Sequence, residues 1–357
     1  MPSSLVPPAL ALALSLALSV AALPGCAARD RGPAVRAGEG MAVGAYDPAT
    51  IEEHRAAMKE LPLADWGTMR YLDEGPRDGE VILLVHGVPT SSWLYRHVIV
   101  GLVAGGHRVI APDLIGFGAS DKPRQTRLLT PVRQAERLLS LMDHLGIATW
   151  THLCHDAGGP WSWELLERAP GRVQRLVVLN TIIYGEGFHP PAHLRHEGVL
   201  SRTLRRALLS ELTGPMWTKT ILAAGLSERS LLDDETVRGY SVPMPEGTAN
   251  AVVHFMSSIY RIERALPRFQ RTLKGFEGPI LVLWGGDDRV LRAREQVPRL
   301  TRELAISRRD VHILPGVKHF IQEEVPGTLV RYIDEFVERP LPCLPAPPHP
   351  RTPGASE

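Results

Sequence analysis

The chain has 357 residues, of which 44% are hydrophobic, and its 40 basic residues nearly balance 39 acidic ones, for a net charge of +1. This length suffices for one large α/β domain with an inserted subdomain, or for two domains. The balanced charge gives no electrostatic reason to expect binding to nucleic acid.

The N-terminal stretch has the features of a targeting signal. Ala9–Leu23 is an apolar run that is too short for a good membrane span, and it ends in Leu23-Pro24-Gly25-Cys26. This ending resembles a bacterial lipobox, which implies cleavage before Cys26, lipidation of that residue and an exported, membrane-anchored protein. Plain secretion is the alternative, because no Lys or Arg precedes the apolar run and Pro24 is unusual there.

Composition and periodicity divide the chain into six expected segments. They are a signal peptide (1–25), a tether (26–48), the first part of an α/β core (49–180), a helical cap (181–265), the second part of the core (266–339) and a disordered Pro-rich tail (340–357). Besides Cys26, the chain has Cys154 in a predicted core strand and Cys343 in the tail, and these two are not expected to form a disulfide.

The predicted core elements alternate between apolar strands and amphipathic helices. In chain order they are a helix (49–61), strands (69–73, 81–85), a helix (93–104), a strand (109–111), a helix (130–145), a strand (151–154), a helix (161–168), a strand (175–180), and then, beyond the cap, a strand (280–284), a helix (294–305), a strand (311–314) and a helix (328–337). This alternation predicts an α/β fold with a mostly parallel central sheet covered by helices on both faces. The helical segment after Asn180 is expected to cover the carboxyl ends of the strands, where ligands bind in such sheets.

The stretch Leu153–Pro160 passes directly from a predicted strand into a predicted helix. Within it, Cys154-His155-Asp156-Ala157-Gly158 has the spacing of the G-x-S-x-G nucleophile elbow, with Asp in the central position. Asp156 would present an ionised carboxylate at the end of the sheet, and the N–H of Ala157 would lie where an oxyanion forms. The alternative is that Asp156 only caps the following helix.

Two further candidate residues follow later strands. Asp288 comes after the strand at 280–284, and His319 follows the strand at 311–314 in a Gly-containing loop. The order Asp156, Asp288, His319 resembles the nucleophile–acid–histidine order of the α/β-hydrolases. Asp287 is an alternative to Asp288: we prefer Asp288 on spacing and treat Asp287 as a helix-capping or surface residue.

Four stretches together resemble the haloalkane dehalogenases and their relatives, the epoxide hydrolases of the α/β-hydrolase fold. They are His86–Ser92, Asp113–Pro123, His155-Asp156 and His319–Glu324. The resemblance runs from Asp73 to Val337. It implies Asp156 as the nucleophile, His319 as the base, Asp288 as the acid that orients the base, and the main-chain N–H groups of Val88 and Ala157 as the oxyanion hole.

The chemistry of these residue types supports the same roles. A carboxylate is ionised near neutral pH, so Asp156 could attack an sp³ carbon without a base and form an ester. His319 would then activate a water that attacks the ester, while Asp288 holds the imidazole in the required tautomer. A serine esterase is disfavoured, because the chain contains no G-x-S-x-G.

The side chains that hold a departing halide differ from those of the resembled family. Family members use a Trp directly after the nucleophile and, in one branch, an Asn within the His-Gly-x-Pro motif; here these positions are Ala157 and Val88. The other branch uses a cap Trp, and Trp217 resembles it, with packing in the cap as the alternative.

Epoxide opening in the resembled family needs cap tyrosines that donate a proton. Three tyrosines are candidates, each with simple packing as the alternative, and Tyr260 is nearest to the second family position: Tyr184, Tyr240 and Tyr260.

The preferred function is therefore a haloalkane-dehalogenase-like hydrolase that acts on a small apolar substrate through a covalent aspartyl ester. The alternatives are an epoxide hydrolase and a catalytically silent, tethered binding protein of the same fold. No cofactor is implied, and no metal, because the chain lacks a zinc-type ligand cluster. We expect a monomer that contacts membrane only through lipid at Cys26 and does not bind nucleic acid.

Overall fold

The structure is a computed structural model that describes residues 46–189, 203, 210 and 213–341. The expected signal peptide, the lipidation site Cys26, most of the tether and Cys343 in the tail lie outside the described residues, as does part of the expected cap. No helix in the described part of the chain is long and apolar enough to cross a membrane.

The described residues contain one sheet, whose strands are β1 (Lys59–Pro62), β2 (Thr68–Glu74), β3 (Val81–Val85), β4 (Arg108–Asp113), β5 (Trp150–Asp156), β6 (Val173–Thr181), β7 (Ile280–Gly285) and β8 (Val311–Leu314). Their order is β1-β2-β4-β3-β5-β6-β7-β8. The pairs β1/β2 and β2/β4 are antiparallel, and the remaining pairs are parallel. The predicted mostly parallel sheet is confirmed.

The helices of the core are α2 (Ile51–Ala56), η1 (Ser92–Tyr95), α3 (Arg96–Ala104), η2 (Thr126–Leu128), α4 (Pro131–His144), α5 (Gly158–Arg168), α10 (Ala293–Glu303), η6 (Arg308–Asp310), α11 (Ile321–Glu324) and α12 (Pro326–Val337). The described cap elements are α7 (Gly214–Gly225), η4 (Arg229–Leu231), α8 (Asp234–Ser241), η5 (Met244–Thr248) and α9 (Ala249–Lys274).

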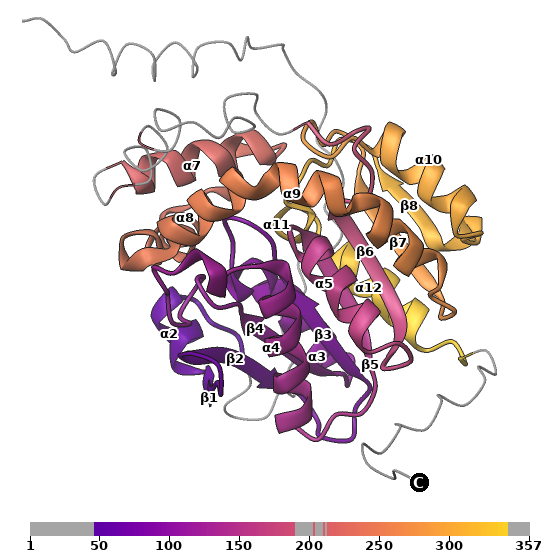
Figure 1. Cartoon of the computed structure of the whole chain (residues 1–357), viewed down its shortest axis with the longest axis horizontal. Coiled ribbons are helices and arrows are strands. Elements are labelled where there is room, and N and C mark those ends of the chain that lie inside the picture. Colours follow the sequence, from indigo (N-terminus) through magenta and orange to yellow (C-terminus); the bar gives the residue numbers. More distant parts are fainter. Residues whose placement is uncertain (1–45, 190–202, 204–209, 211–212, 342–357) are drawn as a thin grey trace, which may run out of the picture. The chain divides into compact units, whose positions relative to one another are not determined.

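Both faces of the sheet are buried, as the apolar strands predict. Successive strand residues point to opposite faces, so in β3 Leu83 packs on the side of α4, α5 and α9, whereas Ile82 packs on the side of α3 and α12. Figure 1 shows α4 and α5 in front of the sheet and α3 and α12 behind it. The apolar stripe predicted for the helix at 130–145 lies in this core through Leu138, Leu141 and Met142.

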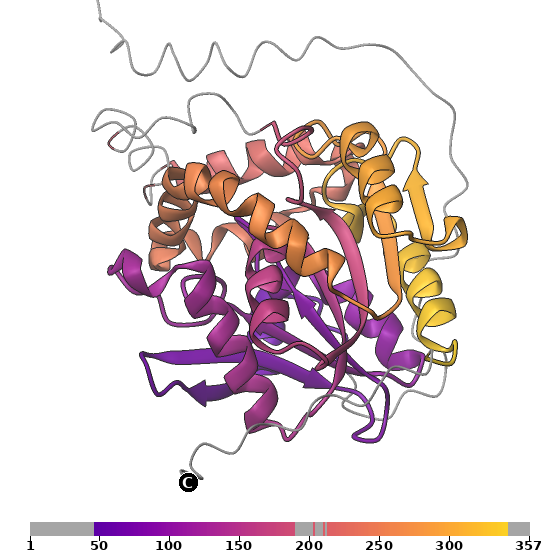
Figure 2. The ribbon, with the colours of Figure 1, turned by 45° about the vertical axis from the view of Figure 1, so that its right-hand side comes forward.

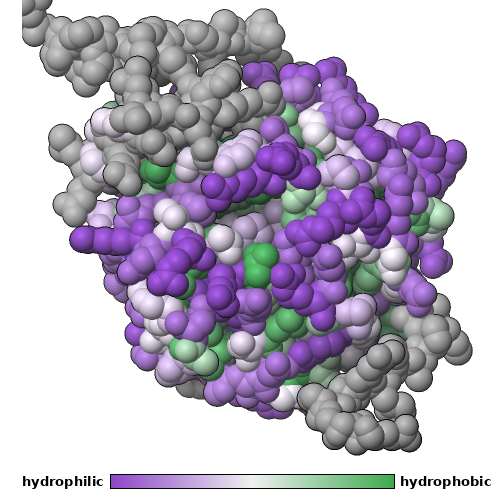
Figure 3. Space-filling model, viewed as in Figure 1, coloured by the Kyte–Doolittle hydropathy of each residue, from purple (hydrophilic) through white to green (hydrophobic). Residues whose placement is uncertain are grey.

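The cap helices lie together beside one end of the sheet. Helix α7 packs against α8, and α9 packs against α5 of the core, an arrangement that both ribbon views show (Figure 1, Figure 2). On the face drawn in Figure 3, hydrophilic residues dominate and hydrophobic residues appear in small separate groups. Helix α9 buries apolar residues such as Val252 and Ile259 in the core.

Among the predicted boundaries, two differ most from the structure. The helix expected at 49–61 ends at Ala56, and Lys59–Pro62 forms the edge strand β1, which pairs with β2. The exposed residues Glu60 and Pro62 alternate with buried Leu61, which suits a strand with one face on the core. At the other boundary, α9 runs to Lys274, beyond the expected end of the cap at residue 265, because its apolar stripe continues onto the core.

Candidate active site

Asp156 stands at a strained turn between β5 and α5. Its φ of 52° is in the left-handed region, which non-glycine residues rarely adopt. Ala157, not Asp156, is the N-cap residue of α5, and no side chain caps this helix. The simple helix-capping interpretation of Asp156 is therefore wrong, and the turn leaves its carboxylate free to face the loops that follow the neighbouring strands.

Small residues let the elbow pack closely. A Cβ on Gly158 would lie 2.7 Å from the carbonyl oxygen of Val85 at the end of β3. At Gly87, a Cβ would lie 2.4 Å from the Cβ of Asp156. Only glycine permits these approaches, so the loop after β3 reaches the carboxylate and the helix lies against the strand.

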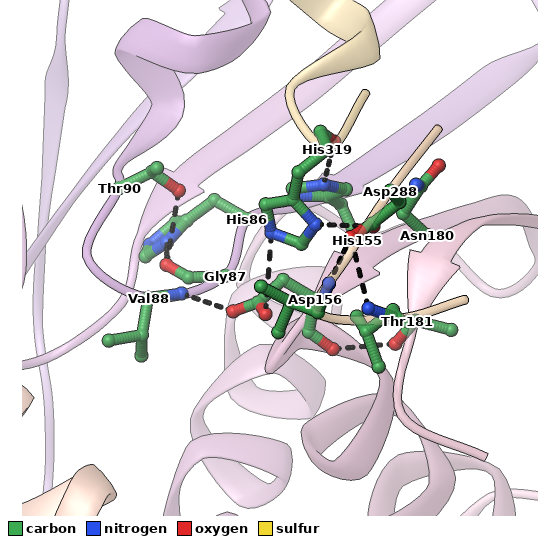
Figure 4. Close-up of polar contacts among 12 residues, drawn as sticks. His86, Gly87, Val88, Thr90, His155, Asp156, Asn180, Thr181, Asp288 and His319 are labelled. Carbon is green, nitrogen blue, oxygen red and sulfur yellow. Dashed lines mark hydrogen bonds and ion pairs between the residues drawn. The ribbon is translucent and has the colours of Figure 1, made fainter. Parts of the chain in front are cut away.

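The loop after β3 supplies a main-chain donor to the carboxylate. The N–H of Val88 donates to Oδ1 of Asp156 at 2.8 Å (Figure 4). His86 fixes this loop, because its Nδ1–H donates to the carbonyl of Gly87 and its Nε2 accepts from the N–H of Leu114 at 3.0 Å. The N–H of Ala157, the other group predicted for an oxyanion hole, belongs to the N-cap residue of α5, directly after Asp156 in the chain.

His319 lies between the two predicted carboxylates. Its Nδ1 is 2.7 Å from Oδ2 of Asp288, and its Nε2 is 3.6 Å from Oδ2 of Asp156 (Figure 4). Asp288 is buried, whereas Asp287 is exposed to solvent. The structure thus brings together Asp156, Asp288 and His319, and it places Asp287 on the surface.

Asn180 is a residue of this site that the sequence did not single out. Its Nδ2 donates to Oδ2 of Asp288 at 2.7 Å, and its Oδ1 accepts from the N–H of Gly285 at 2.9 Å. The other carboxylate oxygen of Asp288 accepts from the N–H groups of Val290 and Leu291. The strand-end position of Asn180, just before the cap, was the available signal, because the ends of adjacent parallel strands meet at one edge.

The charges of the three residues shift one another's pKa values. Burial opposes ionisation of both carboxyl groups, but the neighbouring His319 and the hydrogen bonds from N–H groups lower the pKa of Asp156 and of Asp288 below their usual values. Burial alone would lower the pKa of His319, yet Asp288 and Asp156 outweigh it and raise this pKa to about 10. In the free protein at neutral pH, an imidazolium therefore lies between two carboxylates.

His155, the residue before Asp156 in β5, contacts the backbone of His319. Its Nε2 donates to the carbonyl of His319 at 3.0 Å, since a carbonyl can only accept, and the two rings lie 4.7 Å apart. Burial lowers the pKa of His155 to about 3, so this ring is neutral. In the same region the hydroxyl of Thr181 donates to the main-chain carbonyl of Asp156 at 2.6 Å. These bonds hold the elbow and the histidine loop in one arrangement.

Comparison with known proteins matches this architecture to one family. Residues 80–204 match the family described as the alpha/beta hydrolase fold. Over 262 residues the chain is 32% identical to a haloalkane dehalogenase of Mycolicibacterium paratuberculosis, an alignment that spans 72% of this chain and 83% of the relative. The chain belongs to the haloalkane dehalogenase group of α/β-hydrolases. It is a hydrolase of this type.

Solved structures of dehalogenases and of an epoxide hydrolase share the fold. The haloalkane dehalogenase of Paraglaciecola agarilytica has a TM-score of 0.60 at 24% identity, with 76% of this chain and 91% of that chain covered. An epoxide hydrolase of Vigna radiata has a TM-score of 0.65 at 19% identity, with 79% and 98% covered. At this level of sequence identity, the structural similarity shows the fold and does not identify the substrate.

The cap residues that the family resemblance implies for the leaving group lie in different surroundings. Trp217 of α7 is partly buried and packs against the large apolar cluster on the side of α4, α5 and α9. Tyr260 of α9 lies elsewhere: its hydroxyl accepts from Nε of Arg261 at 2.7 Å in an exposed contact. Its predicted contact with the leaving group is therefore not supported, because the helix turns this hydroxyl to solvent.

The two other candidate tyrosines are also engaged by other groups. The hydroxyl of Tyr240 donates to Oε1 of Glu323 at 2.5 Å in a buried contact, and that of Tyr184 donates to Oε2 of Glu303 at 3.3 Å. Among the described residues, no three His, Cys, Asp or Glu side chains gather in a way that could hold a metal ion.

Proposed function

We propose that this hydrolase displaces a halide from a small apolar haloalkane through a covalent ester on Asp156. The observation that carries the proposal is the carboxylate geometry: Oδ1 receives the N–H of Val88, and Oδ2 faces Nε2 of His319. An oxygen held by a main-chain N–H suits the future carbonyl oxygen of an ester. The other oxygen, Oδ2, is then the attacking atom.

In the first step, Oδ2 of Asp156 attacks the carbon that bears the halogen. The new C–O bond forms as the carbon–halogen bond breaks, and the halide leaves with the bonding electron pair. No base is required, because the lowered pKa of Asp156 keeps the carboxyl ionised. The raised pKa of His319 is compatible with this step, since the histidine does not act in it.

Ester formation itself prepares His319 for the second step. The ester removes the negative charge of Asp156, which is one of the two charges that raise the pKa of His319. The imidazole can then lose its proton and accept one from water, whose oxygen attacks Cγ of the ester. The oxyanion forms on Oδ1 beside the N–H groups of Val88 and Ala157. When this intermediate collapses, the bond from Cγ to the alkyl-bearing Oδ2 breaks, and the departing alkoxide takes the proton held by His319. The water oxygen replaces Oδ2 in the carboxyl group of Asp156, which loses its proton, so the whole reaction consumes one water and releases one proton with the halide.

The site offers few hydrogen-bond donors to the departing halide. Val88 and Ala157 offer no side-chain donor, and the indole N–H of Trp217 is the remaining candidate from the cap. Loss of one such donor in a dry site slows a reaction by about 10²–10³-fold. We therefore expect bromide and iodide, which need less stabilisation as they leave, to be released much faster than chloride.

Epoxide hydrolysis is the weaker alternative, because all three candidate cap tyrosines direct their hydroxyls to other partners. A silent binding protein is disfavoured by the intact set of nucleophile, base and acid. We further propose that the protein is a monomer and that lipid on Cys26 anchors it to a membrane.

Ion release from matched chloro-, bromo- and iodoalkanes, measured beside diol formation from epoxides, tests this proposal. We expect halide release by the wild type and a loss of about 10³-fold or more in Asp156→Asn, whose amide still accepts from Val88 but is a poor nucleophile. Asp287→Asn, a matched change on the surface, is expected to retain activity. Diol formation without halide release from any haloalkane would contradict the proposal.

A further inference from the structure

The end of cap helix α7 contacts the backbone of His319 directly. The carbonyl of Gly225 accepts from the N–H of His319 at 3.0 Å and from the N–H of Phe320 at 3.2 Å. A Cβ on Gly225 would lie 2.5 Å from the ring of Phe320 and 3.6 Å from the Cβ of His319. The cap therefore approaches the loop of the base as closely as a glycine permits.

Side chains extend this contact on both sides of His319. Nζ of Lys318 donates to the carbonyl of Leu226 at 2.8 Å. The carboxylate of Glu324 accepts from the N–H of Lys318 through Oε1 at 2.8 Å, and from the N–H of Ser227 through Oε2 at 3.1 Å. The hydroxyl of Ser227 donates to the same Oε2. One carboxylate thus joins the cap segment 225–227 to the base loop, which we define as residues 318–324.

The neighbouring Glu323 ties the same short helix to two further elements. Its carboxylate accepts two bonds from the guanidinium of Arg96 in α3, at 2.6 and 2.9 Å. It also accepts from the hydroxyl of Tyr240 in cap helix α8. Helix α11 is therefore fastened through two successive glutamates, one to α3 and α8 and the other to the end of α7.

We propose that Glu324 is a positioning residue, which holds His319 over the Asp156 ester by fastening the base loop to the cap segment 225–227. The proposal rests on the ester mechanism above. His319 follows β8 in an irregular loop, so the strand alone does not fix its height above Asp156. A displacement of 1 Å at a reacting group can slow a step by about 10²-fold.

The mechanism predicts where this effect is felt. Ester formation does not use His319, whereas ester hydrolysis does. Loosening the base loop therefore slows the second step and leaves the first unchanged. A purely structural role for Glu324 would instead lower the folded fraction and slow both steps together.

The test compares Glu324→Ala and Glu324→Gln with the wild type by rapid quenching and mass spectrometry of the Asp156 peptide, using a bromoalkane. We expect ester hydrolysis to slow by about 10- to 100-fold in Glu324→Ala, with unchanged ester formation. Glu324→Gln is expected to lie between, because its amide oxygen still accepts from the N–H of Lys318. Ser227→Ala, which removes one donor from the cap side, should slow hydrolysis less than Glu324→Ala.

Glu335→Gln is the matched control. Glu335 lies on the exposed surface of α12, where it pairs with Arg331 at 3.3 Å, and it makes no contact with the base loop. Its removal should change neither step. Equal slowing of both steps in Glu324→Ala, or hydrolysis at the wild-type rate, would overturn the proposal.

Amide hydrogen exchange of the peptide that contains residues 318–320 tests the same tie without any substrate. We expect faster exchange in Glu324→Ala than in the wild type or in Glu335→Gln. Unchanged exchange overturns the proposal, whatever the reaction is. If no protein forms an ester with any substrate, the proposed function fails, and faster exchange would still support the fastening of the base loop to the cap.

Discussion

At Asp156, a single main-chain torsion determines what the carboxylate can reach. A positive φ at a non-glycine residue costs about 1–3 kcal/mol and persists only where surrounding contacts impose it. Here the hydroxyl of Thr181 holds the carbonyl of Asp156, and the N–H of Val88 holds Oδ1. The side chain is thereby aimed at His319 rather than at the first turn of α5.

His319 links the site to the pH dependence of folding. Its pKa is about 10 in the folded protein, against about 6.5 for an unperturbed His. A raised pKa contributes stability that is fully present below the unfolded value and is lost as the pH rises through the folded value. Between these limits, the imidazolium between Asp156 and Asp288 stabilises the fold less and less as the pH increases.

We therefore predict that the difference in free energy of unfolding between the wild type and His319→Gln shrinks as the pH is raised from about 6.5 to about 10. Urea denaturation across that range measures it. His312→Gln, a change at a partly buried histidine outside the site, serves as the control. A difference that stays constant or grows over this range would contradict the charged arrangement described for His319.

Among the elements, the ends of β5, β6 and β7 and the loop after β8 build the site together. Because the parallel strands run in register, their carboxyl ends deliver Asp156, Asn180, Asp288 and His319 to one edge. The pairing of β6 with β7 makes Asn180 a neighbour of Asp288. Its amide donates to one partner and accepts from another, which fixes its orientation.

Asn180→Ala should destabilise the fold by about 1–3 kcal/mol, because the buried N–H of Gly285 loses its acceptor. It should also slow ester hydrolysis more than ester formation, since Asp288 loses a donor that holds it toward His319. Asn250→Ala, at an exposed position of α9, is the matched control. Urea denaturation and single-turnover kinetics give the two values, and equal behaviour of the two variants would show that the bridge has no such role.

Local spacing explains why much of the sheet and the three central residues could be predicted from the sequence. The elbow, the strand at 280–284 with Asp288, and the loop with His319 are each recognisable within a few residues. Strand β1 was missed, because four residues carry too little periodicity to outweigh a neighbouring helix. The role of Asn180 depends on a neighbour in the adjacent strand, which local spacing does not reveal. The orientation of Tyr260 depends on which side of α9 packs against the core, and the sequence alone does not determine this.

At the scale of the whole molecule, two apolar layers on the sheet carry the core, and the cap adds to only part of it. The cluster on the side of α4 and α5 includes cap residues such as Met244 and Phe255, whereas the cluster on the side of α3 and α12 contains none from the cap. A third, smaller cluster joins the cap residues Leu222, Leu226 and Tyr240 to Trp93, Leu94 and Phe320 of the core.

We also propose that the chain is held at a membrane by lipid on Cys26, as the Leu23-Pro24-Gly25-Cys26 pattern indicates. In a bacterial host, Cys26→Ala should move the protein from the membrane fraction to the soluble fraction and abolish incorporation of labelled palmitate. Cys343→Ala is the matched control and should leave both unchanged. Equal solubility of wild type and Cys26→Ala, with label in neither, would contradict the anchor.

The central claim is that Asp156 forms an ester that only His319 can clear, and trapping that ester tests it most directly. His319→Gln should slow ester hydrolysis by about 10²–10⁴-fold while leaving ester formation largely intact. Mass spectrometry of His319→Gln treated with a bromoalkane should then show the Asp156 peptide carrying the alkyl group without the halogen, and Asp156→Asn should show none. An unmodified Asp156 peptide in His319→Gln, from a substrate that the wild type turns over, would contradict the account.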